Sequence, residues 1–143
     1  MPDTPLLVDT SAWVEYLRGT GSRAHLEVRR LVREEPQRLC VTEPVAMELL
    51  AGAGSGPALE KIERLTAGMR QLTIDPAVDF HTAATAYRAA RITGRTVRKL
   101  LDCLIAAVAL RTGATLVHRD QDYDVLAEVL PELSVVSLRG DLS

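Results

Sequence analysis

Aromatic side chains are scarce in this sequence, which has one Trp, three Tyr and one Phe among 143 residues. The core must therefore be built from Leu, Val, Ile and Ala. The scarcity argues against proteins that stack bases on exposed aromatic rings, such as RRM sheets and single-strand-binding OB-folds. Net charge is also small, because 17 Lys and Arg face 19 Asp and Glu. The molecule as a whole therefore exerts no pull on a phosphate backbone, and any contact with nucleic acid must be local.

Cysteine and long apolar runs are lacking as well. Cys40 and Cys103 are too few and too far apart for a zinc site or a disulfide framework, and their apolar neighbours indicate reduced thiols in a core. No apolar run approaches the ~18 residues of a membrane span, and no export signal is visible in residues 1–10. We expect a cytoplasmic protein that has no contact with a membrane.

The composition that remains, 47% hydrophobic and 25% charged, is typical of a globular protein. A largely disordered chain, a collagen-like repeat and a disulfide-rich miniprotein are all excluded. The length fits one domain over residues 1–143, with no internal repeat, low-complexity tract or linker.

Short apolar runs alternate with helical patterns along the chain. The predicted strands are 6–8, 39–41, 72–74, 115–117 and 134–136. The first predicted helix ends at Gly19, the second spans 23–35, and the third runs from Thr42 toward Gly52. The fourth spans 59–68, a helical segment spans 77–111 with a break near Gly94, and the last helix follows Asp120. Strands separated by helices predict an α/β fold, an α/β/α sandwich around a mostly parallel sheet of four or five strands.

Two aspartates, Asp9 and Asp120, stand just past the ends of predicted strands. In open parallel sheets the ligand crevice lies beyond the carboxyl ends of the strands. Each residue alone is more simply a helix N-cap. Two such placements on separate strands favour a shared site.

Asp102 and Glu48 interrupt apolar helical segments. A buried carboxylate without compensation is costly, so Asp102 needs a partner. That partner is Arg98 or Lys99, the dipole at the start of its helix, or a metal ion. Asp122 follows Asp120 at an alternate position, as does Asp124 after it, and in a helix this spacing directs side chains to different faces. One or both are therefore expected to be solvated.

A convergence of Asp9, Glu48, Asp102 and Asp120 would require cations. Carboxylates ~4 Å apart repel by roughly 4 kcal/mol per pair at an effective dielectric constant near 20. All-oxygen ligation without clustered Cys or His selects a hard ion, Mg²⁺ or Mn²⁺. The usual chemistry of such a site is phosphoryl transfer or phosphodiester hydrolysis.

These residues resemble the PIN domain family, and within it the toxin ribonucleases of bacterial VapBC toxin-antitoxin pairs. The motifs that carry the resemblance are Val8–Trp13, Glu48–Gly52, Asp102–Ala107 and Arg119–Tyr123. Any one of them is a weak signal, whereas four in this order and spacing, over nearly the whole chain, are specific. The sequence departs from the family at His118, where Thr is common, and at Tyr123, where Phe is usual. Neither departure removes a carboxylate.

The resemblance implies a single PIN domain that cuts RNA endonucleolytically with Mg²⁺, or with Mn²⁺ as a substitute. Asp9, Asp102 and Asp120 would hold the metal. Glu48, the fourth catalytic acid, would hold a metal-bound water or help to position the attacking one. Nearer the edge of the site would lie Asp122 and Ser11, whose hydroxyl either bonds a metal-bound water or caps the following helix. The implied partners are a VapB-type antitoxin, a second copy of the chain in a homodimer, and an RNA substrate, transfer RNA ahead of ribosomal RNA.

Five cations precede Asp102 at near-helical spacing. They are Arg88, Arg91, Arg95, Arg98 and Lys99. On a continuous helix they form one basic stripe that draws RNA phosphates toward the metal. The alternative is an ordinary solvated face, with Gly94 as a break.

Two further hypotheses come from other classes. One is a catalytically silent PIN-like module that binds RNA or protein, against which the four intact acids argue. The other is a phosphotransfer fold with an aspartyl nucleophile. The sequence lacks the second Asp two residues after Asp9 and the adjacent acid pair that such proteins use.

Overall fold

The computed structural model describes residues 4–140, whose centre is a five-stranded parallel sheet of order β3-β2-β1-β4-β5. The strands are β1 (Leu6–Val8), β2 (Leu39–Val41), β3 (Arg70–Gln71), β4 (Thr115–His118) and β5 (Val135–Ser137). The helices are α1 (Thr10–Arg18), α2 (Arg23–Glu34), α3 (Glu43–Gly52), α4 (Pro57–Gly68), α5 (Asp79–Ile92), α6 (Leu100–Thr112) and α7 (Gln121–Val129). A short 3₁₀ turn, Pro36–Arg38, precedes β2.

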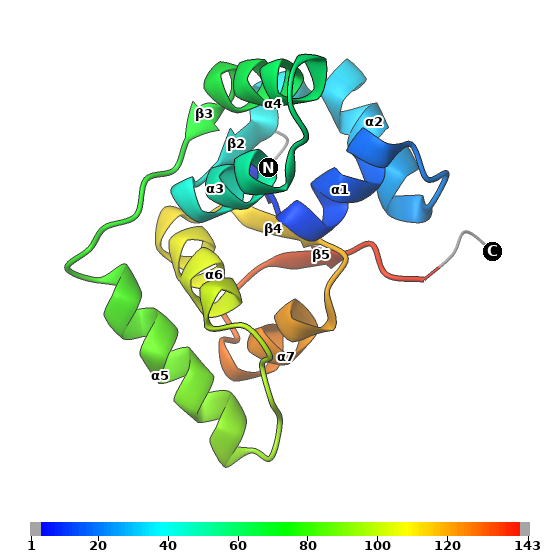
Figure 1. Cartoon of the computed structure of the whole chain (residues 1–143). Helices are drawn as coiled ribbons and strands as arrows, with labels where there is room; N and C mark the ends of the chain where they lie inside the picture. Colours follow the sequence, from blue (N-terminus) through cyan, green and yellow to red (C-terminus); the bar gives the residue numbers. More distant parts are fainter. Residues whose placement is uncertain (1–3, 141–143) are drawn as a thin grey trace.

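Helices cover both faces of this sheet. Helices α1 to α4 lie on one side of it and α5 to α7 on the other (Figure 1). The arrangement follows from the strand order, because the chain moves outward from β1 to β3 and then crosses back to β4, so that right-handed crossovers fall on opposite faces. The predicted α/β/α sandwich with a parallel sheet is confirmed.

The core consists of aliphatic side chains, as the scarcity of aromatics predicts. All three residues of β1 are buried, and so are the apolar residues 103–109 of α6. Both thiols are buried, and burial raises the pKa of Cys40 and raises the pKa of Cys103 to about 12. Among the helices of residues 4–140, none is long and apolar enough to cross a membrane.

The structure corrects the prediction of a strand at 72–74. The third strand is Arg70–Gln71, an exposed edge that pairs with β2, and Leu72 is the buried residue that follows it. An apolar run marks burial, whereas an edge strand is defined by backbone pairing. The closing strand likewise begins one residue later than predicted, at Val135.

The predicted helix 77–111 is two helices separated by residues 93–99. Helix α5 ends at Ile92, Thr93 and Gly94 turn the chain, with Gly94 at φ 81°, and α6 begins at Leu100. The predicted break near Gly94 is confirmed, so the five cations do not form the single stripe expected on a continuous helix. Arg88 and Arg91 lie on α5, whereas the last three cations of the set belong to the connection or cap α6.

Candidate active site

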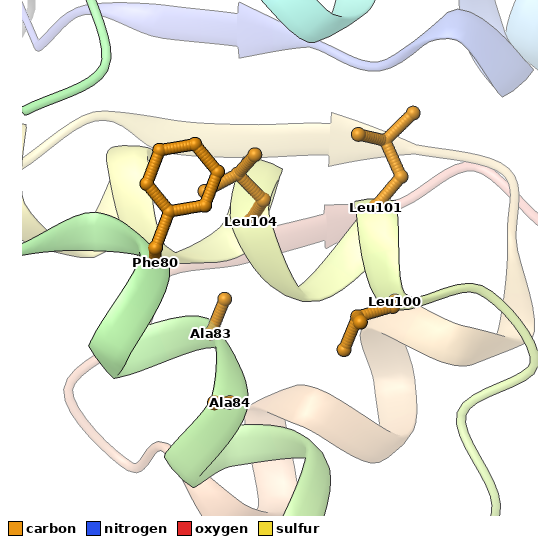
Figure 2. Close-up of a pocket in the computed structure, with 6 residues that line it drawn as sticks. All are labelled: Phe80, Ala83, Ala84, Leu100, Leu101 and Leu104. Carbon is orange, nitrogen blue, oxygen red and sulfur yellow. The ribbon is translucent and has the colours of Figure 1, made fainter. Parts of the chain in front are cut away.

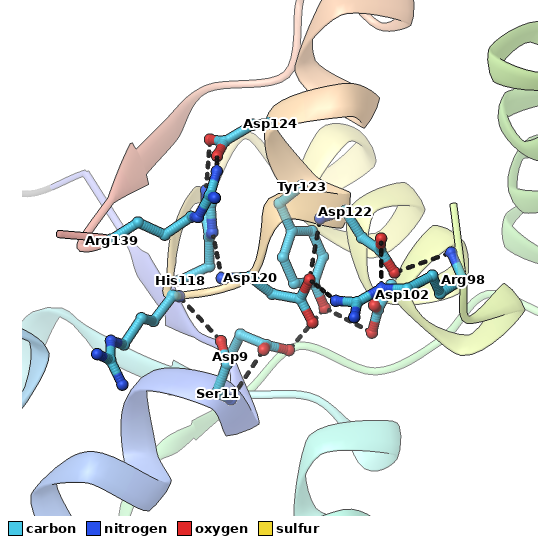
Figure 3. Close-up of polar contacts among 11 residues, drawn as sticks. Asp9, Ser11, Arg98, Asp102, His118, Asp120, Asp122, Tyr123, Asp124 and Arg139 are labelled. Atoms are coloured by element: carbon cyan, nitrogen blue, oxygen red, sulfur yellow. Dashed lines mark hydrogen bonds and ion pairs between the residues drawn. The ribbon is translucent and has the colours of Figure 1, made fainter. Parts of the chain in front are cut away.

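Four aspartates meet beyond the carboxyl ends of β1 and β4 (Figure 3). Asp9 follows β1 and Asp120 follows β4, and these two strands are neighbours, with Val8 paired to Val117. Asp102 reaches the same place from the first turn of α6, and Asp122 from the first turn of α7. The parallel sheet thus brings together acids that lie more than a hundred residues apart in the chain.

A buried tyrosine joins Asp9 to Asp102. The Tyr123 hydroxyl lies 2.6 Å from Oδ1 of Asp9, to which it donates, and 3.2 Å from Oδ1 of Asp102. Burial, together with the negative charges of the two carboxylates, raises the pKa of Tyr123 well above its usual value, so the phenol stays protonated. Asp9 also accepts the Ser11 N–H at Oδ2, 2.9 Å away, and so caps α1.

Asp102 is the least compensated of these acids. Its residue is 3% exposed, and no donor within residues 4–140 bonds its Oδ2 atom. Burial, followed by the nearby charge of Asp9 and the side chain of Asp122, raises the pKa of Asp102 to about 8. Within residues 4–140 Arg98 pairs with Asp120 and Asp122, and neither it nor Lys99 forms the salt bridge to Asp102 that was considered from the sequence.

Asp120 and Asp122 form the other half of the site. Asp120 accepts the Asp122 N–H at 2.9 Å and caps α7, while the Arg98 guanidinium contacts both carboxylates. One oxygen each from Asp102, Asp120 and Asp122 lie within 4.8 Å of one another, close enough to share a metal ion. Asp9 stands beside this group of three, linked to it through Tyr123.

One or both of Asp122 and Asp124 were expected to be solvated, and Asp124 is the partly exposed one, whereas Asp122 is 2% exposed. Asp120 and Asp122 do not follow helical spacing, because Asp120 has extended backbone angles, φ −134° and ψ 128°, and precedes the helix. The Asp120 side chain folds back over the first turn and meets Asp122 there. Asp124 is partly exposed and pairs with Arg139 at 2.8 Å.

Hydroxyls beside Asp9 connect the site to its surroundings rather than cap α1. Thr10 donates its hydroxyl hydrogen to Oε1 of Glu48 at 2.8 Å, which places Glu48 of α3 next to the start of α1. The Ser11 hydroxyl accepts the Arg119 N–H at 2.9 Å and so ties the end of β4 to α1. Glu48 therefore borders the site through Thr10.

His118 packs beneath the site. Its ring is fully buried, with its centroid 5.1 Å from that of Tyr123, and its Nδ1 atom accepts the Asp120 N–H at 3.0 Å. Burial lowers the pKa of His118, so the neutral ring carries its hydrogen on Nε2, 3.4 Å from Asp124. This position is that of a packing histidine and not of an acid that could protonate a leaving group.

Of the five cations predicted to bind RNA, Arg98 contacts the acids. Arg95 pairs instead with Glu128 of α7 at 2.7 Å, and Arg91 lies 5.7 Å from the ring centroid of Tyr87 on its own helix. Sequence reasoning assigned no site role to Tyr123. The signal was present, because a tyrosine three positions after Asp120 in a first turn points back toward its N-cap.

A separate groove of about 250 Å³ lies between α5 and α6 (Figure 2). Its lining is apolar and includes Phe80, Leu100 and Leu104. Without a polar or titratable side chain, it offers no chemistry, and the acid cluster is the site where a reaction can occur.

We predict that Tyr123→Phe destabilises the metal-free protein by about 1–3 kcal/mol, because the buried Asp9 carboxylate then loses a donor. Urea unfolding in EDTA measures the loss. Tyr16→Phe, which leaves the acid cluster untouched, is the control. Equal unfolding midpoints for Tyr123→Phe and the wild type would show that the hydroxyl bonds carry no net stability.

Comparison with known proteins places these residues in context. The family model described as "PIN domain" matches residues 6–129. The chain is 55% identical over 124 residues to ribonuclease VapC11 of Mycobacterium tuberculosis, an alignment that covers 87% of this chain and 92% of that protein.

Solved structures share the fold. DNA-bound VapBC from Salmonella typhimurium superposes with a TM-score of 0.71 and 17% identity, over 94% of this chain and 98% of that one. VapC20 of Mycobacterium tuberculosis, described as a sarcin–ricin loop cleaving toxin, superposes with a TM-score of 0.60 and 20% identity, over 83% of this chain and 92% of that one. At these identities the likeness concerns the fold alone.

Proposed function

The chain belongs to the PIN domain family, among the VapC ribonucleases, and on this premise we propose that it is a Mg²⁺-dependent endoribonuclease, the toxin of a type II toxin-antitoxin pair. One observation carries the proposal. Oδ2 of Asp102 is buried and has no donor among the residues that the structure describes, and oxygens of Asp120 and Asp122 lie within 4.8 Å of an Asp102 oxygen and of each other. An ionised Asp102 facing two more carboxylates is costly unless a cation joins them, and without such a cation the raised pKa keeps Asp102 protonated at neutral pH.

The donor set fits Mg²⁺, with Mn²⁺ as a substitute. It is all oxygen and rich in charge, and the two ring nitrogens of His118 face the Asp120 N–H and the Asp124 carboxylate. We assign Asp102 and Asp120 as ligands, as the sequence predicts, and add Asp122. Asp9 is the remaining predicted ligand, whose oxygens already accept one hydrogen bond each and retain further lone pairs.

A Mg²⁺ ion held by Asp102, Asp120 and Asp122 would supply two things to the proposed reaction: activation of a water molecule and neutralisation of the charge that develops on the phosphate oxygens. The chain itself orients the participants. Tyr123 holds Asp9, and Thr10 holds one oxygen of Glu48, which leaves the other free to accept a hydrogen from the attacking water. Glu48 is then the acidic side chain that positions the attacking water, while the four aspartates fix the position of the metal ion's charge.

The finer assignments follow the family resemblance. We propose transfer RNA as the substrate ahead of ribosomal RNA, and a VapB-type antitoxin as the partner, since the Salmonella typhimurium neighbour is a VapBC complex. We also propose a homodimer. Phe80 and Leu100, which are 54% and 59% exposed, supply apolar surface that a second copy would cover, and light scattering measures the mass in solution.

A cleavage assay tests the function. We expect the wild type to cut a broad RNA pool with Mg²⁺ and to be inert in EDTA, and we expect Asp9→Asn to lower the rate at least about a hundredfold. Glu34→Gln, a change at an exposed ion pair, should cut normally. Mapping the 5′ ends of the fragments then identifies the RNA. Equal inactivity of every sample would instead favour the catalytically silent binding module.

A further inference from the structure

Arg98 occupies an unusual position for an exposed cation. It lies in the connection between α5 and α6, and its side chain is 69% exposed. Its guanidinium nevertheless reaches two acids of the site, with Nη2 3.1 Å from Oδ1 of Asp120 and Nε 3.4 Å from Oδ1 of Asp122. Those carboxylates are only 14% and 2% exposed. A long, exposed side chain thus supplies positive charge to an acid pair that is largely buried.

The backbone at this position is held independently of the side chain. The Arg98 N–H donates to Oδ2 of Asp122 at 3.1 Å, and the preceding residue, Val97, is 2% exposed in the core. A change of the Arg98 side chain therefore leaves the connection anchored. This separation allows the role of the guanidinium to be tested without moving the loop.

The guanidinium and a metal ion would use the same carboxylates. Asp120 and Asp122 are two of the three acids whose oxygens lie close enough to share an ion, and both Oδ1 atoms face the guanidinium. Two cations in contact with one small acid cluster repel each other, so binding of a divalent ion weakens the hold on Arg98.

We propose, on the basis of the function proposed above, that Arg98 is an internal cation that occupies the Asp120–Asp122 side of the site in the metal-free protein and is released to an RNA phosphate when a divalent ion binds. Arginine suits the second role, because its planar fork donates two parallel hydrogen bonds to a phosphate. Of the five cations in residues 88–99, it is the one already at the acid cluster. The release of Arg98 would couple RNA binding to the binding of the metal ion.

The first test is metal binding without RNA. Isothermal titration with MgCl₂ should show about three- to tenfold tighter binding for Arg98→Ala than for the wild type, since an exposed ion pair no longer has to break. Arg95→Ala removes the same charge from the same connection, but its partner is Glu128. It should therefore bind Mg²⁺ as the wild type does. Arg98→Lys, which keeps the charge without the fork, should lie between the two.

The second test is RNA binding with and without a divalent ion. The probe is a fluorescein-labelled 2′-O-methyl RNA hairpin, and fluorescence anisotropy is recorded in CaCl₂ or in EDTA. In CaCl₂ we expect Arg98→Ala to bind about fivefold more weakly than the wild type, with a salt dependence reduced by about one phosphate contact. In EDTA the two proteins should bind alike, because Arg98 is then held by the acids.

The outcomes separate this proposal from the proposed function. If the wild type binds Mg²⁺ and cuts RNA but Arg98→Ala binds both ligands unchanged, the role of Arg98 is refuted and the nuclease stands. Equal gains in Mg²⁺ affinity for Arg98→Ala and Arg95→Ala would likewise refute it, since net charge alone would explain them. A wild type that binds no Mg²⁺ would overturn both proposals.

Discussion

Asp102→Asn should abolish RNA cleavage and, at the same time, stabilise the metal-free protein. The cleavage rate is expected to fall at least about a hundredfold, because Asp102 supplies the carboxylate oxygen that no donor within residues 4–140 satisfies. The neutral amide removes a buried charge from the neighbourhood of Asp9 and Asp122, which should add about 1–3 kcal/mol to the free energy of unfolding in EDTA at pH 8. Loss of function with gain of stability is typical of a residue selected for chemistry.

The raised pKa of Asp102 fixes the direction in which the stability of the metal-free protein changes with pH. The pKa of Asp102 is raised from its ordinary value near 4 to about 8, so between these values the folded state holds a proton that the unfolded state has released. Without metal, the Asp102 contribution to stability is therefore greatest at low pH and declines as the pH rises from about 4 to about 8. Asp102→Asn should remove this decline, as measured by urea unfolding in EDTA at pH 5 and pH 8.

Metal binding supplies the complementary measurement. MgCl₂ should raise the melting temperature of the wild type and of the control Asp124→Asn, which alters a partly exposed acid paired with Arg139. MgCl₂ should leave the melting temperature of Asp102→Asn nearly unchanged. A full Mg²⁺-induced shift in Asp102→Asn would remove this residue from the set of ligands.

Arg111→Met should destabilise the fold by about 3–5 kcal/mol, because it leaves a buried carboxylate without its cation. Asp79 is fully buried at the start of α5, and the Arg111 guanidinium from the end of α6 binds its two oxygens at 2.9 to 3.2 Å. The same guanidinium donates to the Thr73 carbonyl at 2.7 Å. Methionine keeps the apolar stem but removes every one of these donors.

The direction of the pKa shift supports this expectation. Burial alone would raise the pKa of Asp79, yet the hydrogen bonds from Arg111 and from the Asp75 N–H bring it below its ordinary value. The pair therefore stabilises the fold at neutral pH, and this contribution is lost as the pH falls through the lowered pKa.

Two variants serve as controls for urea unfolding. Arg30→Ala breaks three ion pairs on the exposed face of α2 and should cost less than about 1 kcal/mol. The double variant Asp79→Asn/Arg111→Met should recover much of the lost stability, because no charge remains buried. A double variant as unstable as Arg111→Met would contradict the electrostatic explanation.

Local patterns along the chain were sufficient for most of the fold. The strands at 6–8 and 39–41 follow from short apolar runs, and the helix starts at Asp9 and Asp120 follow from capping chemistry, which involves neighbouring residues only. Patterns were less informative at Arg70–Gln71, because pairing at a sheet edge involves backbone atoms whatever the side chains are.

The sequence by itself determined the α/β/α sandwich and the position of Asp9 and Asp120 just past two strands, whose carboxyl ends meet at one edge of a parallel sheet. That Asp102 joins them was implied only by the resemblance to the PIN domain family. Only the tertiary structure decided that Tyr123 joins Asp9 to Asp102, that Asp122 is buried, and that Arg98 holds the acids. These contacts link residues 21 to 114 positions apart. No local propensity encodes them, because a side chain's partner across such a distance depends on the packing of helices that are separate in the chain.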